Sequence, residues 1–210
     1  MNKKEKIKKI SEELERLYPN PVCALVYSKP HELLIAARLS AQCTDKRVNQ
    51  ITPALFSRYP EISSYAEARL CEVEEYVRSC GLYKTKALDI IEMCKMLSQN
   101  YDGIIPDSLD ELLKLPGIGR KTANLMIGTL YGKPAVVTDT HVIRLSNRLG
   151  LVNSQNPEKV EKALRALLWA VLPQRDSLNF CHRLVFYGRE VCKARTPGCE
   201  GCGLPCEARK

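Results

Sequence analysis

Apolar residues recur at steps of three and four along most of this chain, which is the spacing of an amphipathic helix. Residues 7–17 show the pattern clearly: Ile7, Ile10, Leu14 and Leu17 share one face, while lysines and glutamates cover the opposite, solvated face. We find no convincing segment in which polar and apolar residues alternate as in a half-buried strand, and no internal repeat or low-complexity linker. The sequence therefore predicts an all-α fold, which we expect to comprise two helical lobes and a short cysteine-rich tail.

The same spacing predicts the other helices. Pro53 is expected to interrupt the helix that contains it, and Gly81 is expected to end another. Ser108 and Glu111 form a capping-box pattern at the start of a short helix. The expected segments are 30–42, 44–59, 64–70, 72–80, 84–99, 109–114, 120–130, 140–150, 157–172 and 175–192.

The charge and the apolar runs limit the classes of partner. The chain carries 32 lysines and arginines against 24 acidic residues, a formal charge of +8, which favours a polyanion such as nucleic acid. The longest apolar run, residues 166–172, is far too short to span a membrane, and the N-terminal segment lacks the apolar core of a signal peptide. The absence of such segments favours an intracellular, cytoplasmic protein. We also expect it to be a monomer.

The fragment LPGIGRK, residues 115–121, joins two of the predicted helices. Gly117 and Gly119 permit backbone conformations that other residues avoid, and they let main-chain N–H groups approach an anion closely. The N-terminus of the following helix adds partial positive charge, and Arg120 adds a full one. On the glycines alone, an ordinary turn between helices is the favoured interpretation; a phosphate-binding turn is the alternative.

Lys121 follows directly in the first turn of that helix, away from its buried face. A helix N-terminus and a neighbouring cation disfavour the protonated form of an amine, which makes it a better nucleophile. A solvated surface lysine is the simpler interpretation of this position taken alone.

Asp139 precedes the predicted helix that begins at Thr140, so its carboxylate is placed to cap that helix. A capping carboxylate is held in one orientation and kept ionised. It is therefore also suited to stabilising a developing cation, if the reacting group faces it.

Four of the ten cysteines lie within the last nineteen residues, whereas the other six are scattered and are expected to be free thiols. Cys192, Cys199, Cys202 and Cys206 are separated by six, two and three residues, a spacing that can surround one metal centre. This cysteine spacing is compatible with either an iron–sulfur cluster or a structural zinc ion. Lys193 and Arg195, in the longest of these loops, are candidates to meet a DNA phosphate.

Five features occur in order over nearly the whole chain: LSAQCTD, CGLYKTKA, LPGIGRKTAN, DTHVIRLSNRLGL and the four-cysteine C-terminus. Together they resemble the endonuclease III family of helix-hairpin-helix DNA glycosylases. The resemblance implies that the protein removes oxidised pyrimidines from duplex DNA and then cuts the abasic strand by β-elimination through a lysine Schiff base.

The resemblance also implies an architecture. A six-helix barrel over residues 22–132 would carry the hairpin at 115–121, and residues 1–21 and 133–210 would form the second lobe. The cysteine loop at 192–206 would hold a [4Fe-4S] cluster. The last interval of that loop has three residues where the family usually has five, so a structural zinc or no metal remains the alternative.

The resemblance assigns roles to individual residues. Lys121 matches the nucleophile and Asp139 the catalytic aspartate. Gln42 matches the residue that fills the gap left by the extruded nucleotide, and Leu82 matches the wedge that opens the base stack. The positions that match the phosphate contacts of the hairpin are Gly117, Gly119 and Arg120.

The sequence is also compatible with two other functions. One is a mismatch-specific glycosylase that removes adenine or thymine without cutting the strand, although adenine-removing relatives generally lack the lysine found here as Lys121. The other is a non-catalytic helix-hairpin-helix DNA-binding module with a structural zinc.

Overall fold

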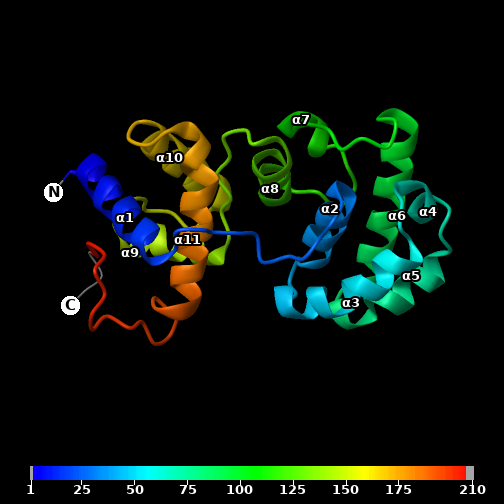
Figure 1. Ribbon diagram of the computed structural model, residues 1–210, viewed down its shortest axis with the longest axis horizontal. Coiled ribbons are helices and arrows are strands. Elements are labelled where there is room, and N and C mark those ends of the chain that lie inside the picture. Colours follow the sequence, from blue (N-terminus) through cyan, green and yellow to red (C-terminus); the bar gives the residue numbers. More distant parts are fainter. Residues whose placement is uncertain (1, 207–210) are drawn as a thin grey trace. The chain divides into compact units, whose positions relative to one another are not determined.

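The computed structural model describes residues 2–206, and over this range it confirms the predicted all-α fold. The only strand-like feature in the described part is an isolated antiparallel bridge between Cys192 and Pro197. The helices are α1 (Lys3–Leu17), α2 (Pro30–Leu39), α3 (Asp45–Arg58), α4 (Ile62–Ala66), α5 (Leu70–Val77), α6 (Tyr83–Asn100), α7 (Leu109–Leu112), α8 (Arg120–Tyr131), α9 (Thr140–Arg148), α10 (Pro157–Trp169) and α11 (Ser177–Glu190), with short 3-10 helices at Arg78–Cys80 and Gln174–Asp176 (Figure 1).

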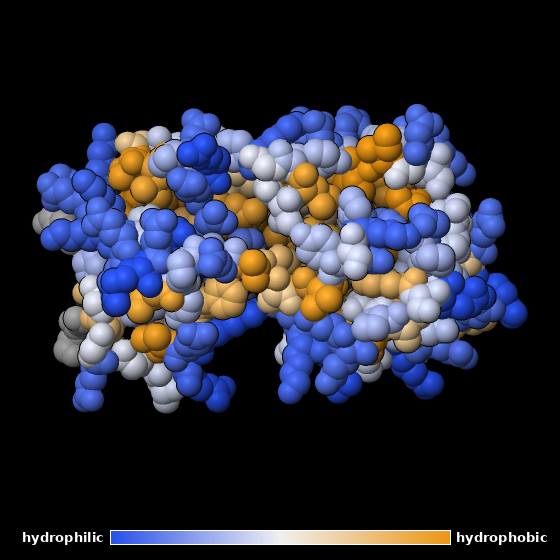
Figure 2. Space-filling model, in the orientation of Figure 1, coloured by the Kyte–Doolittle hydropathy of each residue, from blue (hydrophilic) through white to orange (hydrophobic). Residues whose placement is uncertain are grey.

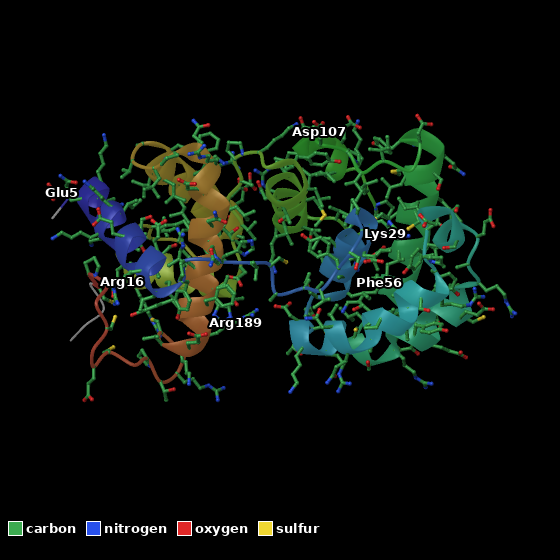
Figure 3. The ribbon with its side chains drawn as sticks, viewed as in Figure 1. Glu5, Arg16, Lys29, Phe56, Asp107 and Arg189 are labelled. Carbon is green, nitrogen blue, oxygen red and sulfur yellow. The ribbon has the colours of Figure 1, made fainter. Side chains whose placement is uncertain are left out.

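Local capping explains where several helices begin. At α1, the Asn2 side chain accepts a hydrogen bond from the Glu5 N–H, and the Glu5 carboxylate accepts one from the Asn2 N–H. Figure 3 labels Glu5 in the first turn of α1 and Arg16 in its last turn, so the charges complement the helix dipole at both ends. Ser108 caps α7 by accepting from the Glu111 N–H, as the sequence pattern predicts.

The chain divides into two compact units. One is Cys23–Met126, which contains α2 to α7 and the first part of α8. In this unit α6 packs against α2, α4 and α5. Its core side chains are fully buried and include Leu33, Leu39, Val48, Leu55, Ile90 and Leu97.

The other unit is Met1–Val22 with Ile127–Lys210, of which residues 2–22 and 127–206 are described. Here α11 packs against α1, α9 and α10, so the first and last helices of the chain lie together (Figure 1). Fully buried residues of this core include Ile7, Ile10, Leu14, Leu164, Phe180 and Leu184. The outward face of α1 is hydrophilic in Figure 2, as its lysines and glutamates predict.

The prediction that Pro53 interrupts its helix is wrong, because α3 continues through it from Asp45 to Arg58. Proline removes one backbone N–H but does not by itself end a helix that packing holds on both sides. Val48 and Leu55, one on each side of Pro53, are both fully buried, and Thr52 is also buried. Tertiary packing therefore overrides the local preference of proline.

The division between units falls after Val22 and within α8 after Met126, whereas the sequence-based expectation placed the second boundary after Gly132. Among the described residues, no helix combines the length and apolar character needed to cross a bilayer.

Candidate functional site

A tight hairpin joins α7 to α8. Leu115 and Ile118 are buried, and the Ile118 N–H donates to the Leu115 carbonyl oxygen at 3.1 Å. Between them, Gly117 has φ +72°, a left-handed conformation that strongly favours glycine. The buried side chains anchor the turn, and the glycine lets the backbone reverse direction towards α8.

The two glycines of this hairpin meet different surroundings. A Cβ at Gly117 would collide with the Arg38 guanidinium and would lie 2.6 Å from Asp89 Oδ2. Arg38 and Asp89 form an ion pair, with Arg38 Nε 2.8 Å from Asp89 Oδ2. A Cβ at Gly119 would instead enter open space. Gly117 is therefore required by the fold, whereas packing leaves the position of Gly119 open to a larger side chain.

Lys121 lies in the first turn of α8 and is exposed, as the helical spacing predicts. The neighbouring turns are held in place, since the Asn124 side chain donates to the Arg120 carbonyl oxygen at 3.0 Å and Ala123 is fully buried. The amine of Lys121 is thus carried by a rigid helix start that directly follows the hairpin.

Asp139 caps α9, and its Oδ1 accepts a hydrogen bond of 2.8 Å from the Val142 N–H. This contact confirms the predicted capping interaction and fixes the orientation of the carboxylate. Two histidines lie in its electrostatic environment. Burial lowers the pKa of both His141 and His182, while the negative charge of Asp139 opposes that change.

Gln42 and Leu82 are both exposed residues in left-handed backbone conformations, with φ +53° and +47°. The segments that carry them are tied together by Lys86, which is fully buried in α6. Its ammonium donates to the Leu39 carbonyl oxygen at 2.9 Å and to the Cys80 carbonyl oxygen at 2.6 Å. The structure therefore links two loops that lie about forty residues apart in the chain and bear two of the predicted DNA contacts.

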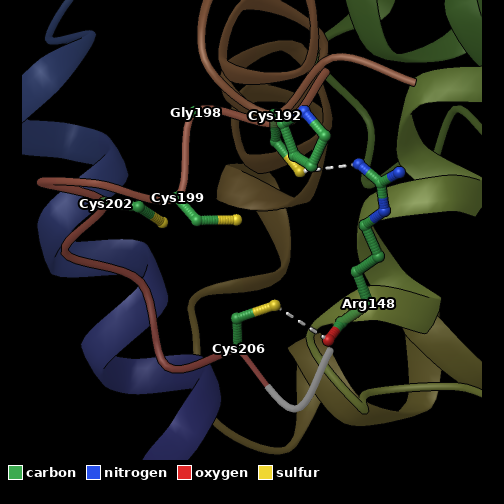
Figure 4. A pocket seen from close by; sticks show the side chains of 7 residues that line it. Arg148, Cys192, Gly198, Cys199, Cys202 and Cys206 are labelled. Atoms are coloured by element: carbon green, nitrogen blue, oxygen red, sulfur yellow. Dashed lines mark hydrogen bonds between the residues drawn. The ribbon is translucent and has the colours of Figure 1, made fainter. Parts of the chain in front are cut away.

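Four cysteines line a single cavity of about 280 Å³ in the unit that contains the C-terminal tail. Figure 4 shows their side chains directed into the cavity from different parts of the tail. The four are Cys192, Cys199, Cys202 and Cys206. Among the described residues, no set of three His, Cys, Asp or Glu side chains has the arrangement of a site for one metal ion.

Arg148 holds one side of this cavity (Figure 4). Its Nη1 donates to Cys192 Sγ at 3.2 Å and to the Lys193 carbonyl oxygen at 2.8 Å, and its Nη2 donates to the Ala194 carbonyl oxygen at 2.8 Å. Tyr187 contributes from α11, where its hydroxyl donates to Cys202 Sγ at 2.8 Å. Sequence reasoning missed both residues, because nothing in their spacing relates them to the cysteines.

The remaining predicted contacts lie in the same tail. The side chains of Lys193 and Arg195 are exposed, and the hydrogen bonds from Arg148 hold the backbone carbonyl groups of Lys193 and Ala194.

The two candidate catalytic residues belong to different units. Lys121 belongs to the unit Cys23–Met126, and Asp139 belongs to the unit that contains the tail.

Known proteins are similar to this chain in both sequence and structure. Residues 35–169 match the family described as HhH-GPD superfamily base excision DNA repair protein. An Endonuclease III from Synechocystis sp. is 44% identical over 204 residues, which cover 97% of this chain and 91% of the relative. An Endonuclease III from Bacillus subtilis is 43% identical over 189 residues, covering 90% of this chain and 84% of the relative.

The structural match is equally extensive. The solved structure described as a trapped Endonuclease III–DNA covalent intermediate superposes with a TM-score of 0.92 at 42% identity. The match covers 99% of this chain and 97% of that chain.

Proposed function

Since this chain belongs to the endonuclease III family of helix-hairpin-helix base excision repair proteins, we propose that Lys121 is the nucleophile of a bifunctional DNA glycosylase and abasic-site lyase. The substrate is duplex DNA containing an oxidised pyrimidine or an abasic site. The main support is the near-complete likeness to an endonuclease trapped in a covalent complex with DNA. A covalent complex needs a nucleophile, and Lys121 presents an exposed amine directly after the hairpin.

In the first step, the neutral amine of Lys121 forms a bond from Nζ to the sugar C1′ as the glycosidic bond breaks. The bond electrons leave with the base, which takes up a proton. Positive charge develops on the sugar during this step, and the Asp139 carboxylate stabilises it electrostatically. The Val142 N–H holds that carboxylate in a fixed orientation, so little reorganisation is needed during the reaction.

In the second step, the nitrogen lone pair forms a C=N bond to C1′, the C1′–O4′ bond breaks and O4′ takes up a proton, so that the lysine adduct becomes a Schiff base. Loss of a C2′ proton then expels the 3′ phosphate by β-elimination, which cuts the strand. Hydrolysis of the Schiff base releases Lys121 for another cycle.

The hairpin and the loops linked by Lys86 are the proposed DNA contacts. The backbone N–H groups around Gly119, together with Arg120, bind a phosphate, since the open space at Gly119 allows close approach. Leu82 and Gln42 enter the base stack when the damaged nucleotide is extruded, a change that costs a few kcal/mol and costs less at a lesion. Lys193 and Arg195 supply further phosphate contacts from the tail.

The cysteine cavity fits a [4Fe-4S] cluster. Four thiols face one space of about 280 Å³, whereas a water molecule takes up about 30 Å³ in the liquid, so the cavity accommodates a multi-atom group. Four thiolates are the usual ligand set for such a cluster. In the proposed site Cys192, Cys199, Cys202 and Cys206 would be the ligands, and a bound cluster would cross-link the segments of the tail. The catalytic steps above do not pass through it.

Borohydride trapping on duplex DNA containing thymine glycol tests the nucleophile. The wild-type protein is expected to form a covalent adduct when the Schiff base is reduced, and Lys121→Gln is expected to form none. Lys114→Gln is the matched control, since Lys114 is another exposed lysine near the hairpin and pairs with Glu111. An equal adduct with Lys121→Gln would overturn the assignment.

The same assay separates the other functions. Base release without an adduct or strand cleavage would indicate a monofunctional mismatch glycosylase, tested in parallel on adenine and thymine mismatches. Binding without base release on any of these duplexes would indicate a non-catalytic module. Metal analysis of the purified protein tests the cofactor, because zinc in place of iron and sulfide would contradict the cluster.

A further inference from the structure

Lys86 is a fully buried lysine near the start of α6. Moving an ammonium group out of water is unfavourable unless new hydrogen bonds replace its hydration. The Lys86 Nζ donates to the Leu39 carbonyl oxygen at 2.9 Å and to the Cys80 carbonyl oxygen at 2.6 Å. Within residues 2–206 its hydrogen-bond partners are these two backbone groups and no carboxylate. The buried charge therefore serves two carbonyl groups and not an ion pair.

Both carbonyl groups lie at the ends of helical segments. Leu39 is the last residue of α2, and Cys80 is the last residue of the 3-10 helix Arg78–Cys80. Carbonyl groups in the last turn of a helix lack partners within the helix and carry partial negative charge, which attracts a cation. The Lys86 ammonium therefore caps two C-terminal ends that are distant in the sequence.

The two residues proposed to enter the base stack follow these ends closely. Gln42 lies three residues after Leu39, and Leu82 lies two residues after Cys80. Both have left-handed backbone conformations, with φ +53° and +47°, which are unfavourable for most residues other than glycine and persist where the surrounding structure imposes them. Since Leu82 is 59% exposed, packing of its own side chain does not hold this conformation.

Lys86 also contacts the second loop through its backbone. The Lys86 N–H donates to the Leu82 carbonyl oxygen at 3.0 Å, at the residue that precedes α6. Lys86 therefore holds the chain at Leu82 itself and at Cys80, two residues earlier. Together with the bond to Leu39, these contacts give the two loops one buried anchor.

We propose that Lys86 is a positioning residue for nucleotide extrusion, whose ammonium holds Gln42 and Leu82 in the conformations that enter the base stack. This inference rests on the proposed glycosylase function and on the roles given to those two residues. Lys86 does not touch DNA, because its side chain is fully buried. It acts by ordering the two loops before DNA binds, since a side chain ordered in advance loses less conformational freedom on binding.

The experiment compares two DNA substrates for Lys86→Met, which removes the ammonium but keeps an unbranched side chain. One substrate is a duplex containing thymine glycol, from which the nucleotide must be extruded out of a paired stack. The other is an abasic site within a bubble of mismatched pairs, where little stacking has to be broken. The rate on the duplex should fall at least about tenfold relative to the rate on the bubble, because Gln42 and Leu82 must then be ordered during extrusion. Both rates are measured on one preparation, so the ratio does not depend on the fraction of protein that is folded.

Lys95→Met is the matched control on the same helix, because Lys95 is exposed and pairs with Glu92. Its ratio of rates should equal that of wild type. Lys86→Gln is a second variant that reaches less far and carries no charge but keeps two N–H donors, so its ratio should also fall, though less. An equal loss on both substrates would show that Lys86 only stabilises the fold, and would overturn the proposal. A wild-type ratio in either Lys86 variant would overturn it as well.

A background that lacks both contact side chains, Gln42→Ala with Leu82→Ala, tests the route of the effect. If Lys86 acts through these two residues, adding Lys86→Met to this background should change the ratio by less than about twofold. A further fall as large as that in the wild-type background would contradict the proposal. A wild-type protein that neither releases the base nor cleaves the abasic site would instead contradict the proposed glycosylase and lyase function.

Discussion

The Arg148 guanidinium donates a hydrogen bond of 3.2 Å to the Cys192 sulfur, and the Arg148 carbonyl oxygen accepts one of 3.3 Å from Cys206 Sγ. One residue at the end of α9 therefore contacts both the first and the last cysteine of the tail. Its position makes it a positioning residue for the proposed cluster, since it also holds the backbone at Lys193 and Ala194.

We expect Arg148→Ala to release iron faster on warming and to lower the reduction potential of the centre, because an N–H donor and a positive charge near sulfur are lost. The stability cost should be about 1.5–3 kcal/mol, the range for hydrogen bonds from charged groups. Visible absorbance during thermal unfolding and voltammetry measure the two effects. Arg58→Ala is the control, since Arg58 forms an exposed ion pair with Glu72 in the other unit. Iron retention equal to wild type would contradict the role of Arg148.

Gly117→Ala should lower the stability of the fold, whereas Gly119→Ala should weaken DNA binding. At Gly117 the added methyl group meets the Arg38–Asp89 ion pair and a left-handed backbone, so unfolding free energy should fall by at least about 1–2 kcal/mol. Gly119→Ala should remain as stable as wild type but bind duplex DNA more weakly. Urea unfolding and binding titrations check both, and equal DNA affinity for Gly119→Ala and wild type would count against the phosphate contact.

Leu82→Gly should weaken base excision without weakening the fold. Glycine adopts φ near +47° without strain, so the substitution should relieve about 1–2 kcal/mol of backbone strain in the folded protein. The greater conformational freedom of glycine in the unfolded chain partly offsets this stabilisation. Asp102→Gly is the matched control, because Asp102 has φ +51° in a turn outside the proposed DNA contacts. The rate of base excision from duplex DNA containing thymine glycol should fall only for Leu82→Gly. Equal rates for both variants would show that the exposed leucine side chain is not needed.

Acidification below about pH 6.5 should destabilise the protein through its histidines. Burial lowers the pKa of His31 from 6.5, against the opposing charges of Glu32 and Glu61. Below 6.5 the unfolded chain therefore binds more protons than the folded chain, so stability is lost as the pH falls towards the folded-state pKa. Urea unfolding from pH 7.5 to 5 should show this loss. His31→Asn should reduce the slope, and an unchanged slope would exclude His31 as a contributor.

Much of the fold follows from the sequence alone, because helical periodicity and capping are local. The spacing of Ile7, Ile10 and Leu14 predicts α1, and Asp139 is recognisable as the cap of α9 from its place before a helix. The cysteine spacing also predicts one metal centre, since its residues lie close together in the chain. The assignments of Lys121 and Asp139 rest on family motifs and stay predictions, and the trapping experiment tests that of Lys121.

Only the tertiary structure decided the features that depend on contacts between distant segments. Packing of Val48 and Leu55 carries α3 through Pro53, against the local preference of proline. Arg148 reaches the cysteines of a tail more than forty residues away, and Lys86 joins the backbone at Leu39 to the backbone at Cys80. The sequence by itself determines which segments are helical, because that information lies within a few turns. Which side chains meet is set by how the helices pack, and a linear pattern of residues does not contain it.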